Sequence, residues 1–489
     1  MKLKSRLLNW STGRPVVLLN SAEAKKLNLH LNDRILLRHN GLKIVAVIDI
    51  ATGLINIGEI GVSTEVSELL HLKNSEEVDF SLANAHEAIS IIKKKMQNLP
   101  LSRSEIKDLI QAVVQNSLSE AEIAFFVSAV SIFGLSFSET VSLIEAIVAS
   151  GKKISFSNKA VFDKHSIGGV SGRTTPIVVS ICAAAGLTIP KTSSRAITSA
   201  AGTADALETI CPFALTASEI QSVVKKTNAC MVWGGSLHLA PADDILIRVE
   251  RLLNLDPTAQ LLASIISKKL AISAKYVVID IPYGAGAKVN KKEAESLEKE
   301  FSKIGKHFGI KITSILTKGD EPIGNGIGPV LEMLDVFNVL QNKNDSYKLK
   351  EKSILLSAKL LELSGKAKKD RSHEMALKIL SSGMAYKKFV EIVEAQGGKE
   401  DAFSKLKPAN NFFIIKAEKN FTIKRIDNKN LNQIAIVAGC PLDKSAGILL
   451  HRHLNAEVKK SEPIMTIYAE SEQKLKDAVK LCKQLHPVE

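Results

Sequence analysis

The sequence has few cysteines, no long apolar run and no apolar segment at its start. Its odd number of widely spaced cysteines, without a CxxC pair, argues against a disulfide or zinc framework and for a reducing compartment. The apolar stretch 177–187 is too short to span a membrane. We therefore expect a cytoplasmic protein without a membrane partner. The five cysteines are Cys182, Cys211, Cys230, Cys440 and Cys482.

Aromatic residues are also scarce, at 5% of the chain, although the net charge is +14. The lysines are spread along the chain in runs such as 93–95 and 366–369, which are typical of solvated faces. Binding of single-stranded nucleic acid needs aromatic side chains on which bases can stack. We expect no nucleic-acid partner, whereas a small substrate that carries phosphate agrees with the charge.

With 489 residues the chain exceeds one hydrophobic core. We expect an α/β multidomain protein, in which a small helical domain and a large α/β domain form a closing cleft, with an N-terminal β-rich domain and a C-terminal α+β domain. The helices of about 240–270 are expected to join the helical domain. The predicted boundaries are 1–85 (N-terminal, assembly), 86–160 (helical), 161–407 (α/β, catalytic) and 408–489 (C-terminal).

Local patterns support this division. Asn40-Gly41 between the runs 34–39 and 42–50 predicts a tight hairpin. Apolar runs at 276–281 and 311–316 predict strands of the α/β domain, and the runs at 447–453 and 463–468 predict strands of the last domain. The Lys/Asn-rich stretch 341–352 is interpreted as an exposed loop. Three Leu-Ser-x-x-Glu patterns predict capping boxes of short helices, at Ser102/Glu105, Ser119/Glu122 and Ser136/Glu139.

Residues 163–175, DKHSIGGVSGRTT, form the first segment that indicates chemistry. Glycines allow backbone N–H groups to form a concave surface, and the start of the helix that follows favours an anion. The segment is not a Walker A loop, because the spacing is one residue short and Arg173 replaces the lysine. An ordinary glycine-rich turn remains the alternative. Lys164, His165 and several hydroxyls favour phosphate binding.

Residues 191–205, KTSSRAITSAAGTAD, form the second such segment. Hydroxyl groups beside Lys191 and Arg195 would suit an oxyanion, although a serine-rich loop explains the same residues. Residues 193–208 resemble the signature of the thymidine and pyrimidine-nucleoside phosphorylase family. The resemblance continues at 164–169, 240–243, 263–269, 284–288, 322–328 and in the C-terminal domain. The N-terminal unit resembles the long subgroup, which contains AMP phosphorylases and bacterial proteins named as thymidine phosphorylases of type 2.

The resemblance implies a pentosyltransferase without a cofactor or metal, in which inorganic phosphate is a co-substrate. It also implies a homodimer or larger homo-oligomer, which we expect to form through the N-terminal domain. The implied phosphate-binding residues are Lys164, Ser166, Thr175, Lys191, Ser193 and Thr203. The implied nucleoside- or nucleotide-binding residues are Gly168, Ser194, Arg195, Ala196, Ile197, Thr198, Ser199, Thr203, Ser264, Lys268 and Lys288.

Phosphorolysis needs an anion held below C1′ of the sugar and assistance to the departing base. His165 is one candidate for that assistance, and a neutral histidine that orients the loop is its alternative. Asp256 matches the proton donor of the AMP-cleaving branch. Because Asp256 precedes Pro257, it also fits the cap of a helix.

The substrate signals conflict. Lys164-His165-Ser166 resembles the thymidine-cleaving members and favours thymidine phosphorylase activity. Lys288 could pair with a 5′-phosphate, and the stretch 247–251 has no clear match for the arginine that contacts the pyrimidine. AMP or another nucleoside 5′-monophosphate is therefore the alternative substrate. An anthranilate-type phosphoribosyltransferase is a less favoured alternative, since residues 167–170 lack an acidic residue. A nucleic-acid-binding protein is also less favoured.

Overall fold

The computed structural model describes residues 1–83, 86–156, 160–196, 199–237, 239–343 and 346–489. The chain divides into two units, each of which we describe by itself. The first unit comprises Met1–Ser150 and Pro241–Gln260, and the second comprises Gly151–Ala240 and Leu261–Glu489. Within the described residues, no helix combines the length and the apolar character needed to cross a membrane.

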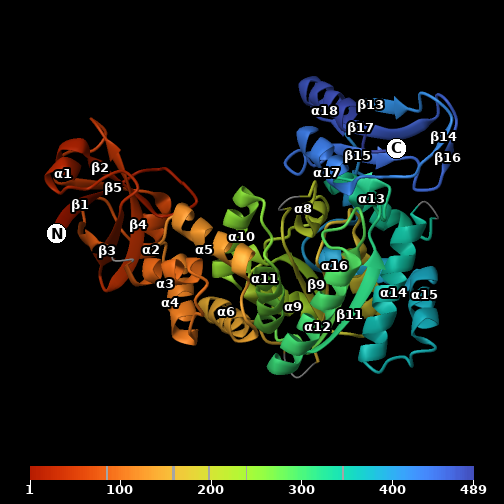
Figure 1. Ribbon diagram of the computed structural model, residues 1–489, viewed down its shortest axis with the longest axis horizontal. Coiled ribbons are helices and arrows are strands. Elements are labelled where there is room, and N and C mark those ends of the chain that lie inside the picture. The colour runs from red at the N-terminus through yellow and green to blue at the C-terminus, as the bar shows by residue number, and fades with distance from the viewer. Residues whose placement is uncertain (84–85, 157–159, 197–198, 238, 344–345) are drawn as a thin grey trace. The chain divides into compact units, whose positions relative to one another are not determined.

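The first unit begins with a closed barrel in the strand order β1–β5–β2–β4–β3–β6 (Figure 1). Closure leaves no strand edge unpaired. The predicted hairpin is confirmed, because His39 pairs with Leu42 and both Asn40 and Gly41 have positive φ, at 47° and 82°. The elements are β1 (Lys2–Leu7), β2 (Val16–Asn20), α1 (Ser21–Lys26), β3 (Arg34–His39), β4 (Leu42–Ala51), β5 (Glu59–Val62), α2 (Thr64–Leu70) and β6 (Glu77–Leu82).

Three helices of the first unit begin at the predicted capping boxes. At Ser102 the backbone N–H donates to Glu105 at 2.7 Å and the hydroxyl accepts from the Glu105 N–H at 3.2 Å. The pairs Ser119/Glu122 and Ser136/Glu139 are bonded in the same way. The helices are α3 (His86–Met96), α4 (Arg103–Val114), α5 (Glu120–Phe133), α6 (Phe137–Ser150) and α10 (Pro241–Leu253), and α10 packs against α4, α5 and α6.

The second unit is built on parallel strands. β10 pairs with β11 on one side and β7 on the other, and a bridge between Val161 and Thr188 brings the parallel pair β8–β9 next to β7. Parallel strands buried on both faces need helices on those faces. The strands are β7 (Phe162–Ser166), β8 (Ile189–Ser193), β9 (Ala229–Trp233), β10 (Tyr276–Tyr283) and β11 (Lys311–Lys318).

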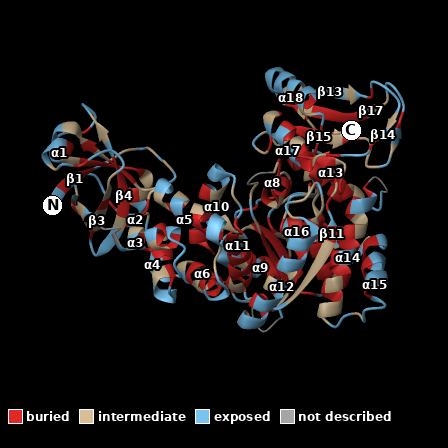
Figure 2. Ribbon diagram, in the orientation of Figure 1, coloured by how far each residue is buried: buried red, intermediate tan, exposed pale blue. Residues whose placement is uncertain are grey.

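Helices supply the rest of this core. Helix α7 (Thr174–Ala184) is buried along nearly its whole length and packs against α14, α15 and α16, whereas α15 and α18 present exposed faces (Figure 2). The other helices are α8 (Thr203–Leu207), α9 (Ala217–Thr227), α11 (Thr258–Ala271), α12 (Lys291–Phe308), α13 (Pro329–Leu340), α14 (Tyr347–Leu363), α15 (Ser372–Ser381), α16 (Met384–Ala395) and the 3-10 turns η1 (Gly235–Leu237) and η2 (Glu400–Ala402).

The prediction of an exposed loop over 341–352 is wrong for its second half. Helix α14 starts at Tyr347, and Lys352 is only 9% exposed. Two interactions explain the difference: Leu349 enters the α/β core, and the Lys352 ammonium lies 2.9 Å from the Asp280 carboxylate on β10. A run of lysines therefore belongs to a packed helix because one of the lysines has a buried partner.

The C-terminal part forms a four-stranded sheet in the order β12–β15–β17–β13, packed on α17 and α18. Its strand β12 comes from within the α/β region, so that two distant segments share one sheet. With the N-terminal barrel, the helices and the parallel sheet, this architecture confirms the predicted fold class. The elements are β12 (Gly326–Ile327), β13 (Asn411–Lys416), β14 (Phe421–Thr422), α17 (Asn428–Val437), β15 (Gly447–Leu450), β16 (Glu457–Val458), β17 (Pro463–Ala469) and α18 (Glu472–Leu485).

Candidate active site

The candidate site lies at the carboxyl ends of the parallel strands in the second unit. Strand β7 contains Lys164 and ends at Ser166, and strand β8 contains Lys191 and ends at Ser193. In open parallel sheets, ligands bind at this edge because every strand there delivers its following loop to one place. The two sequence segments that indicated phosphate chemistry are thus brought together by parallel strands joined at the Val161–Thr188 bridge.

Lys164 is buried at this edge. Its ammonium donates to the Thr174 hydroxyl at 2.7 Å and to the Thr175 hydroxyl at 3.4 Å, both at the start of α7. Burial is the main cause that lowers the pKa of Lys164, to about 8, while the carboxylate of Asp280 acts in the opposite direction. The lysine therefore sits near its titration point at physiological pH.

Lys191 shares a carboxylate with a second buried lysine. The Asp163 oxygens lie 3.6 Å from the Lys191 ammonium and 2.5 Å from that of Lys269 on α11. Burial lowers the pKa of Lys191 to about 7, with Asp163 opposing the shift and Lys269 adding to it. One carboxylate thus faces two ammonium groups.

The charges of this buried lysine cluster do not balance within the described residues. Four buried lysines, at 164, 191, 269 and 352, face two buried carboxylates, those of Asp163 and Asp280. The buried hydroxyl of Ser193 has no hydrogen-bond partner among the described residues. An unpaired buried hydroxyl costs free energy unless a ligand or water bonds to it. Excess positive charge beside an available hydroxyl is suited to an oxyanion such as phosphate.

His165 follows Lys164 on β7. Burial and then the neighbouring lysines, Lys269 first, lower the pKa of His165 well below its ordinary value. At neutral pH the imidazole is therefore uncharged. It can donate one hydrogen bond, but it is a poor source of a full proton for a departing base.

Lys288 lies against the glycine turn that follows β7. The Ser166 hydroxyl donates to Asp280 at 2.9 Å and accepts from the Gly168 N–H at 3.4 Å, which fixes the turn to β10. A Cβ at Gly169, where φ is +90°, would lie 2.8 Å from Cγ of Lys288. The stem of Lys288 therefore covers the turn, whereas its side chain is exposed, unlike those of the buried lysine cluster.

Asp205 of α8 binds both described ends of the segment between β8 and α8. Its carboxylate accepts from the backbone N–H groups of Ala196 at 2.7 Å and Gly202 at 2.8 Å. Arg195 pairs with Asp205 and Glu208, and its guanidinium lies 4.8 Å from the centre of the Trp233 ring. The predicted residues Ser194 and Ser199 lie in this loop and Thr203 begins α8, whereas Ile197 and Thr198 fall outside the described residues.

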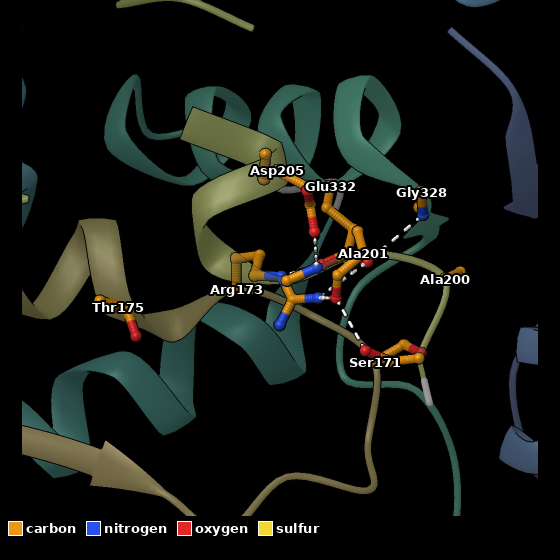
Figure 3. A network of polar contacts seen from close by, with 12 residues as sticks. Ser171, Arg173, Thr175, Ala200, Ala201, Asp205, Gly328 and Glu332 are labelled. Carbon is orange, nitrogen blue, oxygen red and sulfur yellow. Dashed lines mark hydrogen bonds and ion pairs between the residues drawn. The ribbon is translucent and has the colours of Figure 1, made fainter. Parts of the chain in front are cut away.

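Arg173, which precedes α7, joins the same loop to α13. Its guanidinium donates to the Ala201 carbonyl and lies 2.5 Å from the Glu332 carboxylate (Figure 3). Burial raises the pKa of Glu332 to about 7, opposed first by Arg173. The Arg173 guanidinium is therefore engaged by a carbonyl and a carboxylate of the protein itself.

The remaining predicted residues lie on or before α11. The Lys268 ammonium donates to the Ser264 hydroxyl at 3.1 Å, one helical turn away, and both are half-buried in the second unit. Asp256 belongs to the first unit, where it lies exposed between α10 and α11. Helix α11 begins at Thr258, two residues after Asp256.

Comparison with known proteins places the chain in a family. Residues 89–151 match the helical bundle domain of the glycosyl transferase family, residues 158–386 its a/b domain, and residues 422–488 the pyrimidine nucleoside phosphorylase C-terminal domain. The AMP phosphorylase of Pyrococcus furiosus is 42% identical over 100% of this chain and 97% of its own length. The chain belongs to the pyrimidine-nucleoside phosphorylase family, which includes AMP phosphorylases.

Other relatives agree with this assignment. The AMP phosphorylases of Methanococcoides burtonii and Thermococcus kodakarensis are each 41% identical over 100% of the chain and 97% of their own length. The protein is therefore a phosphorylase of the pentosyltransferase class, acting on substrates of the nucleoside type. This confirms the predicted enzyme class.

Solved structures support the same fold at much lower identity. Anthranilate phosphoribosyltransferase from Thermus thermophilus has a TM-score of 0.51 at 15% identity, over 63% of this chain and 99% of that one. The enzyme from Saccharomyces cerevisiae in complex with PRPP and Mg has a TM-score of 0.53 at 14% identity, over 64% and 99%. At such identity the likeness shows that the phosphorylase shares their fold.

The structure adds residues to the candidate site that the sequence did not single out. The Asp163 carboxylate pairs with both Lys269 and Lys191. The Asp280 carboxylate pairs with Lys352 and accepts a hydrogen bond from the Ser166 hydroxyl. One signal was present for Asp280: it is an acidic residue inside the apolar strand β10. A carboxylate in such a place needs a partner, but the sequence does not reveal that the partner is Lys352.

Proposed function

We propose that this phosphorylase cleaves a nucleoside 5′-monophosphate, with AMP as the first candidate, to give adenine and ribose 1,5-bisphosphate. The observation that carries the proposal is the stem of Lys288 over the turn Gly168–Gly169, next to Ser166. It supplies an exposed cation outside the buried lysine cluster. Two cation positions suit a reaction whose two substrates each bring a phosphate group.

Two further observations favour the nucleotide over thymidine. The three relatives described above match the whole chain and are named AMP phosphorylases, which favours our alternative substrate over the thymidine interpretation. In α10, where a pyrimidine-contacting arginine would be expected, the Arg248 guanidinium lies 3.6 Å from Glu120 and is half exposed. In this structure Arg248 is therefore engaged by a carboxylate of helix α5.

In the proposed reaction, an oxygen of inorganic phosphate attacks C1′ as the bond from C1′ to the base nitrogen breaks. The bonding electron pair leaves with the base, which takes up a proton. Lys164, Lys191 and Ser193 would hold the attacking phosphate, since their charges and the unpaired hydroxyl suit it. The resemblance gives the proton to Asp256, and the neutral His165 supports that choice because it is a poor acid.

The experiment is to incubate the purified protein and phosphate with AMP, CMP, UMP, thymidine or uridine, in buffer that contains EDTA, and to detect the free base. We expect release of adenine from AMP, dependent on phosphate and insensitive to EDTA. A requirement for added Mg²⁺ would favour the phosphoribosyltransferase alternative. Release of thymine from thymidine without cleavage of any monophosphate would overturn the proposal.

A further inference from the structure

Two asparagines of the C-terminal domain contact the loops of the candidate site. Asn428 and Asn432 lie one turn apart on α17, so their side chains project from the same face of the helix. Both are buried, at 1% and 9% exposure. Neither belongs to the residues that the phosphorylase resemblance singles out.

Asn432 joins the two phosphate segments. Its side-chain oxygen accepts from the Ala200 N–H at 2.8 Å, in the loop after β8. Its Nδ2 lies 3.3 Å from the Ser171 hydroxyl, in the loop after β7, and 2.7 Å from the Asn428 carbonyl. Ser171 and Ala200 flank the Arg173 network in Figure 3, where Arg173 reaches the next residue, Ala201. One amide therefore fixes the two loops to each other.

Asn428 fixes the loop that carries Lys288. Its Nδ2 donates to the Gly286 carbonyl at 2.9 Å and to the Gly319 carbonyl at 3.3 Å, in the loops after β10 and β11. A Cβ at Gly286 would lie 2.5 Å from that nitrogen, so only glycine allows the contact. Two residues later, Lys288 packs over Gly169.

The unused part of the Asn428 side chain argues against a purely stabilising role. Its Oδ1 is buried without a hydrogen-bond partner among the described residues. A buried unpaired acceptor costs free energy, and an apolar side chain of similar size would avoid that cost. What Asn428 supplies is therefore the pair of donations to the loops after β10 and β11.

We propose that Asn428 and Asn432 are positioning residues through which the C-terminal domain fixes the geometry of the two anion-binding positions. Asn428 positions the loop that carries Lys288, which binds the 5′-phosphate of the nucleotide. Asn432 positions the loops after β7 and β8, which bind inorganic phosphate. The assignment of Asn428 rests on the proposed function. Neither side chain needs to touch a substrate. Their effect comes from loop placement, where an error of about 1 Å can cost about 100-fold in rate.

The test compares Asn428→Ala, Asn432→Ala and Asn430→Ala in the full-length protein. Asn430 lies on the same helix and donates to the Leu485 carbonyl within the C-terminal domain, which makes it the matched control. We expect Asn428→Ala to raise the KM for AMP about tenfold and to leave the KM for phosphate within about twofold. Asn432→Ala should do the reverse, and Asn430→Ala should change neither KM.

Two further variants address the same contacts from the loops, should the alanine variants fail to fold. Gly286→Ala displaces Asn428, and Ser171→Ala removes the hydroxyl that faces Asn432. Each should reproduce the KM change of its asparagine. Equal changes of both KM values in the two asparagine variants, or a loss of Tm without any change of KM, would overturn the proposal.

Direct binding separates this proposal from the proposed function. Binding of inorganic phosphate and of AMP to each variant is measured by calorimetry, without turnover. If the wild type binds AMP but releases no adenine, the proposed function fails, whereas weaker AMP binding by Asn428→Ala still supports the positioning role. Phosphate binding that is unchanged in Asn432→Ala would refute that role whatever the substrate.

Discussion

The buried lysine cluster and the exposed Lys288 offer positive charge in two different ways. In the cluster, Lys164 and Lys191 are out of water, their pKa values are lowered to about 8 and about 7 by burial, and neighbouring aspartates oppose the shift. Lys288 has its stem on a glycine turn and is an exposed residue. Desolvation strengthens a bond to an anion but makes the charge depend on pH. The buried position therefore suits the reacting phosphate, and the exposed one suits recognition of a group that does not react.

The largest effect is expected from Lys164→Met, which removes the buried charge and keeps the length of the side chain. Loss of one preorganised donor to the reacting phosphate should lower kcat/KM by about 100- to 1,000-fold. The measurement is the initial rate at varied phosphate concentration. Lys359→Ala is the control, since Lys359 pairs with Glu362, which is not one of the carboxylates of the buried lysine cluster. A Lys164→Met enzyme with unchanged phosphate kinetics would remove Lys164 from the site.

A smaller effect is expected from Lys288→Ala. A charge-assisted bond to phosphate contributes about 1.5–3 kcal/mol, so kcat/KM for AMP should fall by about 10- to 100-fold. The same substitution should leave turnover of a nucleoside without a 5′-phosphate nearly unchanged. Comparison of AMP with adenosine on both proteins measures the difference. A parallel loss on both substrates would mean that Lys288 serves the fold of the turn and does not recognise the 5′-phosphate.

The contrast between these two positions also shows what the sequence could predict. Turn and cap chemistry is local, so Asn40-Gly41 and the Ser-x-x-Glu boxes predicted their structures correctly. The two phosphate segments were also recognisable, because their glycines, hydroxyls and lysines are close in sequence. The partners of those residues are not: Ser166 bonds to Asp280 across 114 positions, and Ser171 lies 261 positions from Asn432. Only the tertiary fold brings such residues together.

The same limit explains the error at 341–352. A lysine-rich stretch is ordinarily solvated, and nothing near Lys352 in the sequence indicates a buried carboxylate. The partner, Asp280, lies on β10 inside the parallel sheet. Lys352 could therefore not be predicted as a buried residue beside the site, whereas the two glycine- and hydroxyl-rich segments could be recognised from the sequence.

A third prediction concerns pH and separates the two positions further. A lysine whose pKa is lowered is charged below that pKa and neutral above it, and phosphate needs the charged form. The KM for phosphate should therefore rise by about tenfold from pH 7 to 8, where Lys191 loses its proton, and more steeply from pH 8 to 9, where Lys164 loses its proton as well. The measurement is the KM for phosphate at constant ionic strength.

Two outcomes would decide how this pH dependence arises. In Lys191→Met the component near pH 7 should disappear, while the component near pH 8 remains. Bound phosphate stabilises the charged forms, so phosphate should also raise the Tm more at pH 7 than at pH 9. A KM for phosphate that stays constant from pH 7 to 9 would mean that the lysines are fully charged in the free enzyme.

The smallest kinetic effect is expected from removal of residues 1–83, the barrel. The barrel has its own apolar core and no open strand edge. It contacts the helical part through the Arg34 guanidinium, which donates to the carbonyls of Asn116 and Leu118. None of the residues that we place at the two anion positions lies in the barrel. A chain starting at residue 84 should therefore keep kcat/KM within about twofold, but light scattering should show a smaller oligomer than the full-length chain forms. If the two proteins had the same oligomeric state, the prediction that the chain assembles through the barrel would be wrong. A large loss of kcat/KM in the shortened chain would mean that the barrel supports the active site.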